Sequence, residues 1–298
     1  MDRTGWLIYT REDAEKNKWF IEKFKSECQK FGITLKLVYT DDVPDNTENA
    51  ASLVDITCDE YGIPSLAVNR SRQSFISTEL ESRGVRVFNP AAVTDIGNDK
   101  ELSYRLAEKL NIPYMPFITA SAAETGDICD KAAAFGYPFV LKPSDGHGGK
   151  HVFLIDNEAG LKDALKLMAD ECAGDQYKKL LIQRPCAVWG RDLRVYLVGG
   201  KIIAGTLRLA GNKNEFRANF SLGGRAVPHE LNSEEQMLTK RISDALPSDF
   251  IGIDFIYDKD GRPVFNEIED AVGSRMLYSE TDIDIISLFA RHIHSVTG

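Results

Sequence analysis

The sequence predicts an α/β fold that begins with a small parallel sheet and continues with hairpin-rich sheets. Residues 5–88 alternate short apolar runs with amphipathic stretches, as parallel β-α-β units do. The rest of the chain holds pairs of apolar strands joined by glycine-containing turns, which is typical of antiparallel hairpins. With 298 residues and 43% hydrophobic content, the chain can bury the cores of two or three packed units.

The opening segment is expected to be a parallel α/β unit. Each predicted helix in it is followed by a glycine, Gly32 or Gly84, which can end a helix in the left-handed conformation. The polar stretch Asp41–Asn49 is expected to be a loop. Strands are predicted at Gly5–Thr10, Ile33–Tyr39, Ser65–Val68 and Val85–Phe88, and helices at Arg11–Phe31 and Arg70–Arg83.

Three polar residues follow the third predicted strand. Asn69, Arg70 and Arg72 stand just past its carboxyl end, where ligands of open α/β sheets bind. The solvated start of the next helix is the simpler interpretation, and contact with a ligand is the alternative.

The middle of the chain is predicted to combine helices with one hairpin. Asn98 and Asp99 can cap a helix that runs from Lys100 to Leu110. A lysine in the first turn of a helix is mildly unfavourable, so Lys100 is a candidate for another role. Further helices are predicted at Ala120–Phe135 and Glu158–Asp170, and the hairpin strands at Pro138–Lys142 and His151–Ile155.

The loop of this hairpin, Ser144–Lys150, has the composition of a phosphate-binding loop. Gly146, Gly148 and Gly149 permit backbone conformations in which successive N–H groups converge on an anion. A Walker loop is excluded because a strand, not a helix, follows. The dinucleotide fingerprint is excluded because its third glycine is absent. An ordinary glycine-rich surface turn remains the alternative.

Two further strands are predicted to form a charged hairpin after an apolar strand. The strand that opens at Leu180 contains Pro185, which cannot donate to a sheet. Gly199-Gly200 then joins Arg191–Val198 to Lys201–Arg208. The polar residues expected to project from this sheet or from the loop 211–224 are Asp192, Arg194, Arg208, Arg217 and Asn219.

The last hairpin, residues 251–257 and 263–270, carries three carboxylates. Pairing through a two-residue Lys259-Asp260 loop would place Asp254 opposite Phe265 and diagonal to Glu267, with Glu269 on the same face. Converging carboxylates repel unless a cation lies among them, and Mg²⁺ or Mn²⁺ would meet that need. The alternative is an edge hairpin whose acids face water.

Composition narrows the class of protein. A net charge of −9 and a pI near 5.2 argue against a nucleic-acid-binding surface. The five cysteines are scattered and include no CxxC pair, which disfavours a disulfide framework and a zinc ribbon. Charges interrupt every apolar run, and the start lacks a signal-peptide core. We therefore expect a cytoplasmic protein without a membrane partner.

In this order, the motifs resemble the ATP-grasp superfamily, and most of all the group of glutathione synthetases and ribosomal-protein glutamate ligases. The resemblance covers about residues 95–296 and rests on a first lysine, a second lysine before a glycine-rich lid, a hinge strand and a carboxylate hairpin. It implies a pre-ATP-grasp domain at residues 1–95, an ATP-grasp subdomain with the lid at 96–180, and a metal-binding ATP-grasp subdomain at 181–298.

The resemblance also implies roles for single residues. Gln183 stands where many relatives have glutamate, and Glu269 stands where most have asparagine, which adds one negative charge to the metal site. Nucleotide-binding residues would be Lys100, Lys142, Gly146, His147, Gly148, Gly149, Gln183, Arg184, Cys186 and Asp192. Residues near the γ-phosphate and the acyl substrate would be Arg194, Arg208, Arg217, Asn219 and Arg275, and metal ligands Asp254, Glu267 and Glu269.

The implied activity is that of an ADP-forming carboxylate–amine ligase that uses ATP and Mg²⁺ or Mn²⁺. Phosphoryl transfer to a carboxylate would give an acyl phosphate, which an amine attacks to form an amide. The substrates would be small carboxylates and amines, amino acids or a peptide, and a homodimer is left open. One alternative is a catalytically weak ATP-binding sensor or scaffold, which the retained acids and lysines disfavour. A reaction without amide formation is the other.

Overall fold

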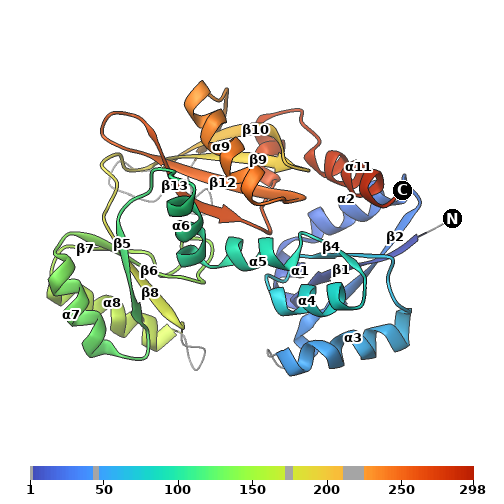
Figure 1. Cartoon of the computed structure of the whole chain (residues 1–298), viewed down its shortest axis with the longest axis horizontal. Helices are drawn as coiled ribbons and strands as arrows, with labels where there is room; N and C mark the ends of the chain where they lie inside the picture. Colours follow the sequence, from blue (N-terminus) through green and yellow to red (C-terminus); the bar gives the residue numbers. More distant parts are fainter. Residues whose placement is uncertain (1–2, 43–46, 172–176, 211–224) are drawn as a thin grey trace.

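The structure is a computed structural model that describes residues 3–42, 47–171, 177–210 and 225–298. Its strands form a parallel four-stranded sheet, an antiparallel five-stranded sheet and an antiparallel four-stranded sheet (Figure 1). The predicted α/β class, with a parallel sheet first and antiparallel sheets after it, is confirmed.

The N-terminal sheet has the strand order β2-β1-β3-β4, and all its neighbours are parallel. Apolar residues of both faces are buried, because helices pack on either side of the sheet. The strands are β1 (Arg3–Tyr9), β2 (Ile33–Tyr39), β3 (Leu66–Asn69) and β4 (Arg86–Phe88). The helices are α1 (Arg11–Lys16), α2 (Lys18–Gln29), α3 (Thr47–Tyr61) and α4 (Ser74–Ser82), and a short 3₁₀ helix spans Thr40–Asp42.

Several predicted element bounds in this unit are wrong. The single helix predicted at 11–31 breaks at Asn17, whose side-chain amide donates to the carbonyl of Asp13 over 2.7 Å. Helix α3 covers part of the predicted polar loop. Helix α4 begins at Ser74, because Asn69 accepts the Ser71 N–H and Arg72 adopts a φ of 66°.

The antiparallel four-stranded sheet has the order β5-β8-β6-β7, with helices α7 and α8 over one face (Figure 1). The predicted helix start at Ala120 is wrong, because Ala120 belongs to a strand that pairs with β8. Strand β8 spans the predicted boundary at 180, so we propose a subdomain boundary after Gln183 instead. The bounds are β5 (Phe117–Ser121), α7 (Thr125–Phe135), β6 (Phe139–Pro143), β7 (Phe153–Ile155), α8 (Glu158–Glu171) and β8 (Lys179–Gln183).

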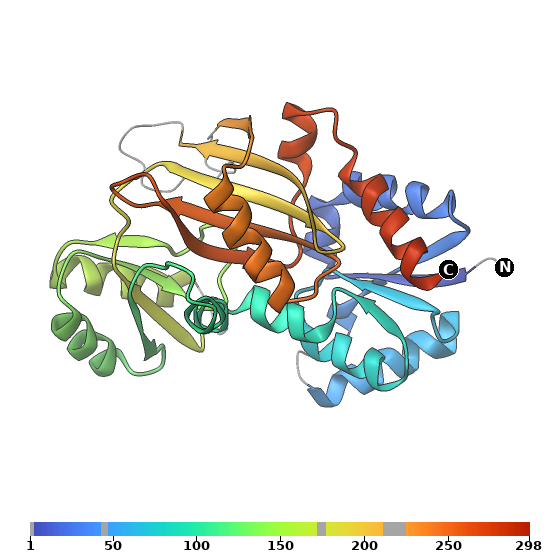
Figure 2. The same cartoon turned by 45° about the horizontal axis from the view of Figure 1, so that its top comes forward.

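The five-stranded sheet has the order β11-β10-β9-β12-β13. Helix α9 crosses one face of this sheet, and α11 lies between its opposite face and α2 (Figure 2). The predicted turn at Gly199-Gly200 is confirmed, with positive φ at both glycines. The strands are β9 (Arg191–Val198), β10 (Lys201–Leu209), β11 (Arg225–His229), β12 (Phe250–Tyr257) and β13 (Pro263–Glu269). The helices are α5 (Ala91–Asn98), α6 (Lys100–Lys109), α9 (Ser233–Ala245), α10 (Arg275–Glu280) and α11 (Ile285–Thr297).

The register of the β12–β13 hairpin differs from the predicted one. Phe255 pairs with Phe265, and a bulge at Asn266 then sets Asp254 directly opposite Glu267. The turn is longer than two residues, because the N–H of Asp258 donates to the carbonyl of Arg262. The bulge brings the two carboxylates closer than the predicted diagonal pairing would.

The N-terminal sheet and the five-stranded sheet share one hydrophobic core. Phe24 of α2 stacks on Phe289 of α11 with ring centroids 5.1 Å apart, and Phe250 of β12 completes the cluster. This shared core fixes the N-terminal unit beside the carboxylate hairpin. Among the residues that the structure describes, no helix is long and apolar enough to span a membrane.

Candidate active site

A pocket lies between the antiparallel four-stranded sheet and the five-stranded sheet, and we call it the nucleotide pocket. Its apolar walls include Val140, Val188 and Ile256. Nine of the ten predicted nucleotide-binding residues line it: Lys100, Lys142, Gly146, Gly148, Gly149, Gln183, Arg184, Cys186 and Asp192. The tenth, His147, is exposed on the loop and does not line the pocket. The structure thus brings together residues that are far apart in the sequence.

Lys142 is the buried cation of this pocket. Its Nζ lies 3.0 Å from the hydroxyl of Tyr104, and only 6% of the residue is exposed. Burial lowers the pKa of Lys142 to about 8, although the nearby Glu267 carboxylate opposes the shift. Tyr104 also donates to Gln183 Oε1 over 3.3 Å. The sequence analysis missed Tyr104, because a tyrosine on the apolar face of a helix looks like any core residue.

Lys100 ties the glycine loop to helix α6. Its backbone N–H donates to the carbonyl of Ser144 over 2.8 Å, and its Nζ donates to the carbonyl of Gly146. The same Nζ lies 3.5 Å from Glu267 Oε2. Asp99 caps the helix as predicted. The capped start of α6 therefore holds one lysine between the loop and the carboxylate hairpin.

The glycine loop needs its glycines at two positions. Gly148 and Gly149 have φ of 66° and 74°, in the left-handed region that side chains disfavour. Gly146 does not have a positive φ, but a Cβ there would meet Pro143 at 3.2 Å. The strands on either side pair as predicted, with Phe139 opposite Ile155.

The predicted adenine hinge follows strand β8 directly. The strand ends at Gln183, so Pro185 lies outside it and removes no ladder hydrogen bond. The Gln183 amide donates to the Met115 carbonyl over 3.1 Å. The Cys186 thiol donates to the Tyr257 carbonyl over 2.6 Å. The Cys186 contact joins the hinge to the five-stranded sheet, and the Gln183 contact joins it to the segment before β5.

Asp254, Glu267 and Glu269 converge, with ligand oxygens that all lie within 4.8 Å of one another. Asp254 is completely buried, which excludes the water-facing alternative for this residue. The side chains of Glu267 and Glu269 are 25% and 31% exposed. Three hard oxygen donors, of which Glu267 and Glu269 are partly open to solvent, fit a magnesium or manganese ion.

Two buried arginines join these carboxylates. Arg194 pairs with both oxygens of Asp254 and, at 2.6 Å, with Glu269. Arg208 pairs with Asp254 at 2.5 Å and with Asp192 through two hydrogen bonds. The predicted need for a cation among these acids is therefore met in part by the chain itself, which supplies two guanidinium groups. Burial would raise the pKa of Asp254, but the arginines outweigh burial and lower it.

The carboxylate of Asp192 behaves differently. Its pKa is raised to about 6, mainly by burial and also by the charge of Asp254, while Arg208 opposes the rise. Asp192 lines the nucleotide pocket but already accepts two hydrogen bonds from Arg208. Asp192 therefore connects the nucleotide pocket to the arginine pair.

A second pocket adjoins the nucleotide pocket at Gly148, and we call it the basic pocket. It is built from the N-terminal unit, the arginine pair, and the start of α10 with the two residues before it. Its lining residues are Lys16, Asn17, Trp19, Phe20, Arg70, Gly148, Arg194, Arg208, Glu269 and Gly273–Met276. It contains the predicted Arg208 and Arg275, whereas the predicted Arg217 and Asn219 lie outside the described residues.

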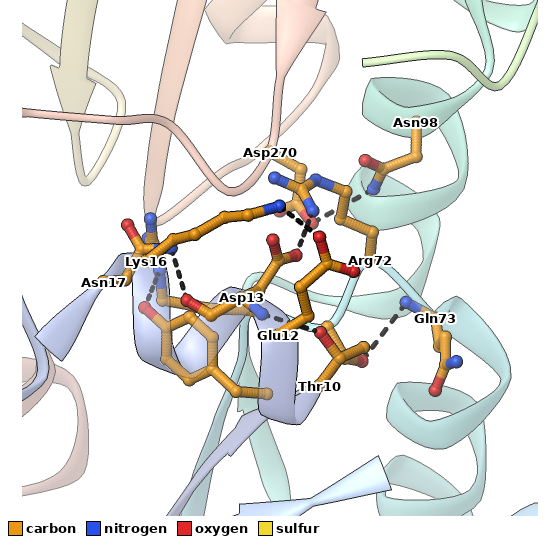
Figure 3. Close-up of polar contacts among 12 residues, drawn as sticks. Thr10, Glu12, Asp13, Lys16, Asn17, Arg72, Gln73, Asn98 and Asp270 are labelled. Atoms are coloured by element: carbon orange, nitrogen blue, oxygen red, sulfur yellow. Dashed lines mark hydrogen bonds and ion pairs between the residues drawn. The ribbon is translucent and has the colours of Figure 1, made fainter. Parts of the chain in front are cut away.

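Asn69 and Arg70 are buried, at 2% and 6% exposure, so the solvated-helix interpretation is wrong for them. Arg72 instead pairs with Asp13 at 2.5 Å, beside the basic pocket's Lys16 and Asn17 (Figure 3). The carboxyl edge of the N-terminal sheet therefore presents a polar cluster to the site, as the topology of open α/β sheets favours.

Comparison with known proteins agrees with this architecture. The family model described as RimK-like ATP-grasp domain matches residues 97–293, so the chain belongs to the RimK-like ATP-grasp family of carboxylate–amine ligases. An uncharacterized protein of Mycoplasma genitalium is 27% identical over 99% of this chain and 93% of its own length. Human N-acetylaspartylglutamate synthase A is 28% identical over 78% of this chain and 59% of its own length.

The fold is also that of solved ligases. The crystal structure of a D-alanine–D-alanine ligase from Bacillus anthracis complexed with ATP superposes with a TM-score of 0.68 and 16% identity. The match covers 99% of this chain and 100% of that one. At this identity the likeness concerns the fold alone.

Proposed function

We propose that this chain is an ATP-dependent, ADP-forming ligase that joins a carboxylate to an amine through an acyl phosphate. The observation that carries the proposal is the contact of the two pockets at Gly148, with the carboxylate trio beside it. Glu267 lines the nucleotide pocket and Glu269 lines the basic pocket. A phosphoryl group leaving the first pocket would therefore meet an acid held in the second.

The residues of the nucleotide pocket would position ATP. Lys100 and Lys142 would hold the phosphates, and the N–H groups of the loop 146–149 would cover the transferred group. Gln183, Arg184 and Cys186 would contact adenine, and Asp192 the ribose. Support for this arrangement comes from the pocket lining.

The residues of the basic pocket would position the acid. Arg208 and Arg275 would stabilise negative charge on the transferring phosphoryl group and on the acyl oxygen, with Arg217 and Asn219 proposed to join them. No side-chain nucleophile is required, because the chemistry depends on positioning and charge neutralisation. Asp254, Glu267 and Glu269 would hold Mg²⁺ or Mn²⁺, which when bound neutralises phosphate charge.

Names of relatives support the substrate class. Human N-acetylaspartylglutamate synthase A and the probable α-L-glutamate ligase of Parasynechococcus marenigrum, 28% identical over 75% of this chain, have amino-acid products or substrates in their names. We propose amino acids or a peptide as substrates of this chain as well. The five arginine and lysine residues of the basic pocket suit an anionic substrate.

A screen for ADP release tests the proposal. Pairs of carboxylates and amines are incubated with MgATP, and products are identified by mass spectrometry. We expect one pair to give ADP, phosphate and an amide in equal amounts. Lys142→Ala and Glu267→Ala should lose ADP formation, whereas Lys240→Ala, in an exposed ion pair on α9, should not. ATP binding without any acid-dependent ADP formation would instead support the sensor or scaffold.

A further inference from the structure

Arg70 and Ser274 are two buried polar residues that line the basic pocket. We infer that they bind a carboxylate which the substrate carries in addition to its reacting group. The pocket would then select α-amino acids or dicarboxylic acids. The inference rests on the proposed ligase function, because it assigns a substrate to the pocket beside the nucleotide. Arg70 comes from the N-terminal unit, so that unit would contribute directly to specificity.

Arg70 is a buried cation with neutral partners. Its Nε donates to the Tyr9 hydroxyl over 2.7 Å, and its Nη2 donates to the Val272 carbonyl over 2.9 Å. Its guanidinium lies 4.2 Å from the centroid of the Phe20 ring. Within the described ranges, no carboxylate lies within ion-pair distance of it. A buried charge without a directly paired counter-ion is costly, and an anionic ligand would supply one.

The carboxylates of the same region have other partners. Asp13 pairs with Arg72 at 2.5 Å, and Asp270 accepts from Asn98 at 3.3 Å (Figure 3). Asp270 also accepts from Asn89 at 2.6 Å. Neither acid lies within ion-pair distance of Arg70, although the charge of Arg70 opposes the rise that burial causes in the pKa of Asp270.

The other deeply buried cations of the pocket are already neutralised. Arg194 pairs with Asp254 and Glu269, and Arg208 pairs with Asp254 and Asp192. Of the three buried arginines that line the basic pocket, Arg70 alone lacks such a partner among the described residues. An incoming carboxylate would therefore gain most at Arg70.

Ser274 supplies a second, independent sign of a ligand. The residue is 2% exposed, and its Oγ has no hydrogen-bond partner in the described part of the chain. It lines the same pocket as Arg70. A buried hydroxyl without a partner costs free energy unless a ligand provides one, and a carboxylate oxygen would accept a hydrogen bond from it.

The chemistry of the two groups favours a carboxylate. A planar guanidinium matches the two oxygens of a carboxylate, and a neighbouring hydroxyl adds a third donor. The phosphates of ATP would lie in the adjoining nucleotide pocket, so the anion at Arg70 belongs to the other substrate. An amino acid and a dicarboxylic acid could both place a carboxylate at Arg70 and Ser274. The two ligands differ in whether they also carry an amino group.

Binding measurements test the inference without turnover. Proteinogenic amino acids, short dicarboxylic acids and the carboxamide of each are titrated by calorimetry in the presence of a non-hydrolysable ATP analogue. The proteins are the wild type, Arg70→Met, Arg70→Lys, Ser274→Ala and the control Arg83→Met. Arg83 belongs to the same N-terminal unit but pairs with Asp55 and Glu79 on its surface.

We expect the wild type to bind a carboxylate more tightly than its carboxamide. Arg70→Met should weaken carboxylate binding about 10- to 100-fold and leave the carboxamide and the ATP analogue unaffected. Ser274→Ala should weaken carboxylate binding by a smaller factor and should fold normally, since its Oγ bonds to no described group. Arg70→Lys should be intermediate, and Arg83→Met should match the wild type. Binding of amino acids but not dicarboxylates would identify an amino group as part of the ligand.

The outcomes separate this inference from the ligase proposal. Unchanged carboxylate binding in Ser274→Ala and in a folded Arg70→Met or Arg70→Lys overturns the inference and leaves ligase activity untouched. Failure of all carboxylates to bind the wild type overturns it as well. Arg70-dependent carboxylate binding without ADP release supports the inference and contradicts the ligase proposal.

Discussion

Arg194 and Asp254 form an ion pair with two hydrogen bonds in the interior of the five-stranded sheet: Nε lies 2.8 Å from Oδ1, and Nη2 lies 2.6 Å from Oδ2. The two residues face each other on β9 and β12, so sheet register alone brings them together. The same Arg194 Nη2 lies 2.6 Å from Glu269 Oε1. One guanidinium thus organises two of the three candidate metal ligands.

Removing this guanidinium should destabilise the protein. Arg194→Met leaves the fully buried Asp254 with Arg208 as its only cationic partner among the described residues, at an expected cost of about 3 kcal/mol in the free energy of unfolding. Lys240→Met, which removes an exposed ion pair on α9, should cost less than about 0.5 kcal/mol. Urea unfolding of both variants measures the difference, and equal midpoints would contradict the role given to Arg194.

The carboxylate trio should differ in its contributions to metal affinity. Glu267→Gln removes a charged ligand and should weaken Mn²⁺ binding about tenfold or more. Glu269→Asn keeps an oxygen donor and should weaken it less. Titration monitored by electron paramagnetic resonance measures both affinities. The metal assignment fails if Glu267→Gln binds Mn²⁺ as the wild type does.

The pKa of Lys142 predicts how ATP affinity depends on pH. Burial lowers this pKa to about 8, and phosphates favour the charged form, so affinity for MgATP should fall up to about tenfold per pH unit above pH 8. Lys142→Arg stays charged and should bind with little change over that range. Calorimetry in buffers of different ionisation enthalpy should also show proton uptake on binding. A pH-independent affinity in the wild type would contradict this account.

The lowered pKa of Lys142 also makes the free energy of unfolding depend on pH. Between about pH 8 and 10.5 the unfolded chain retains the Lys142 proton that the folded protein has lost. The contribution of Lys142 to the free energy of unfolding should therefore rise with pH in this window. Measuring the free energy of unfolding of the wild type and of Lys142→Met at pH 8 and pH 10 isolates the contribution of Lys142.

Gln183 should resist replacement by glutamate. Its Nε2 donates to the Met115 carbonyl over 3.1 Å, and a glutamate would set two acceptors against each other at a site that is 4% exposed. Gln183→Glu should therefore lower the free energy of unfolding by about 1–3 kcal/mol at neutral pH. The loss should shrink in acid, where the carboxyl can donate. Urea unfolding of the wild type and of Gln183→Glu at two pH values measures this loss. An unchanged midpoint would contradict the role given to the hydrogen bond between Gln183 and the Met115 carbonyl.

Local patterns predicted the parts of the fold that depend on local chemistry. Asp99 caps α6 as expected, Gly199-Gly200 turns the central hairpin, and the alternation in β13 places Glu267 and Glu269 beside Asp254. The sequence analysis did not predict helix α3 or strand β5. Both elements depend on tertiary partners, such as the pairing of β5 with β8, that local patterns do not reveal.

The candidate site was predicted in composition but not in its electrostatics. The order of lysines, glycines and carboxylates indicated the nucleotide pocket. A bulge, however, depends on how two strands fit, so the pairing of Asp254 with Glu267 could not be predicted from spacing. Arg194 was expected near the substrate, but its bond to Asp254 depends on the pairing of β9 with β12, which are far apart in the sequence. Nothing in the sequence marked Ser274 as lacking a partner.

Oxygen transfer from the acid to phosphate tests the central claim most directly. The carboxylate identified by the ADP-release screen is labelled with ¹⁸O and incubated with MgATP, its amine and the wild-type protein, and the released phosphate is analysed by mass spectrometry. An acyl-phosphate route predicts one ¹⁸O atom in each phosphate, because the carboxylate oxygen attacks the γ-phosphorus and leaves with it. Phosphate without the label, released together with the amide, would contradict the account.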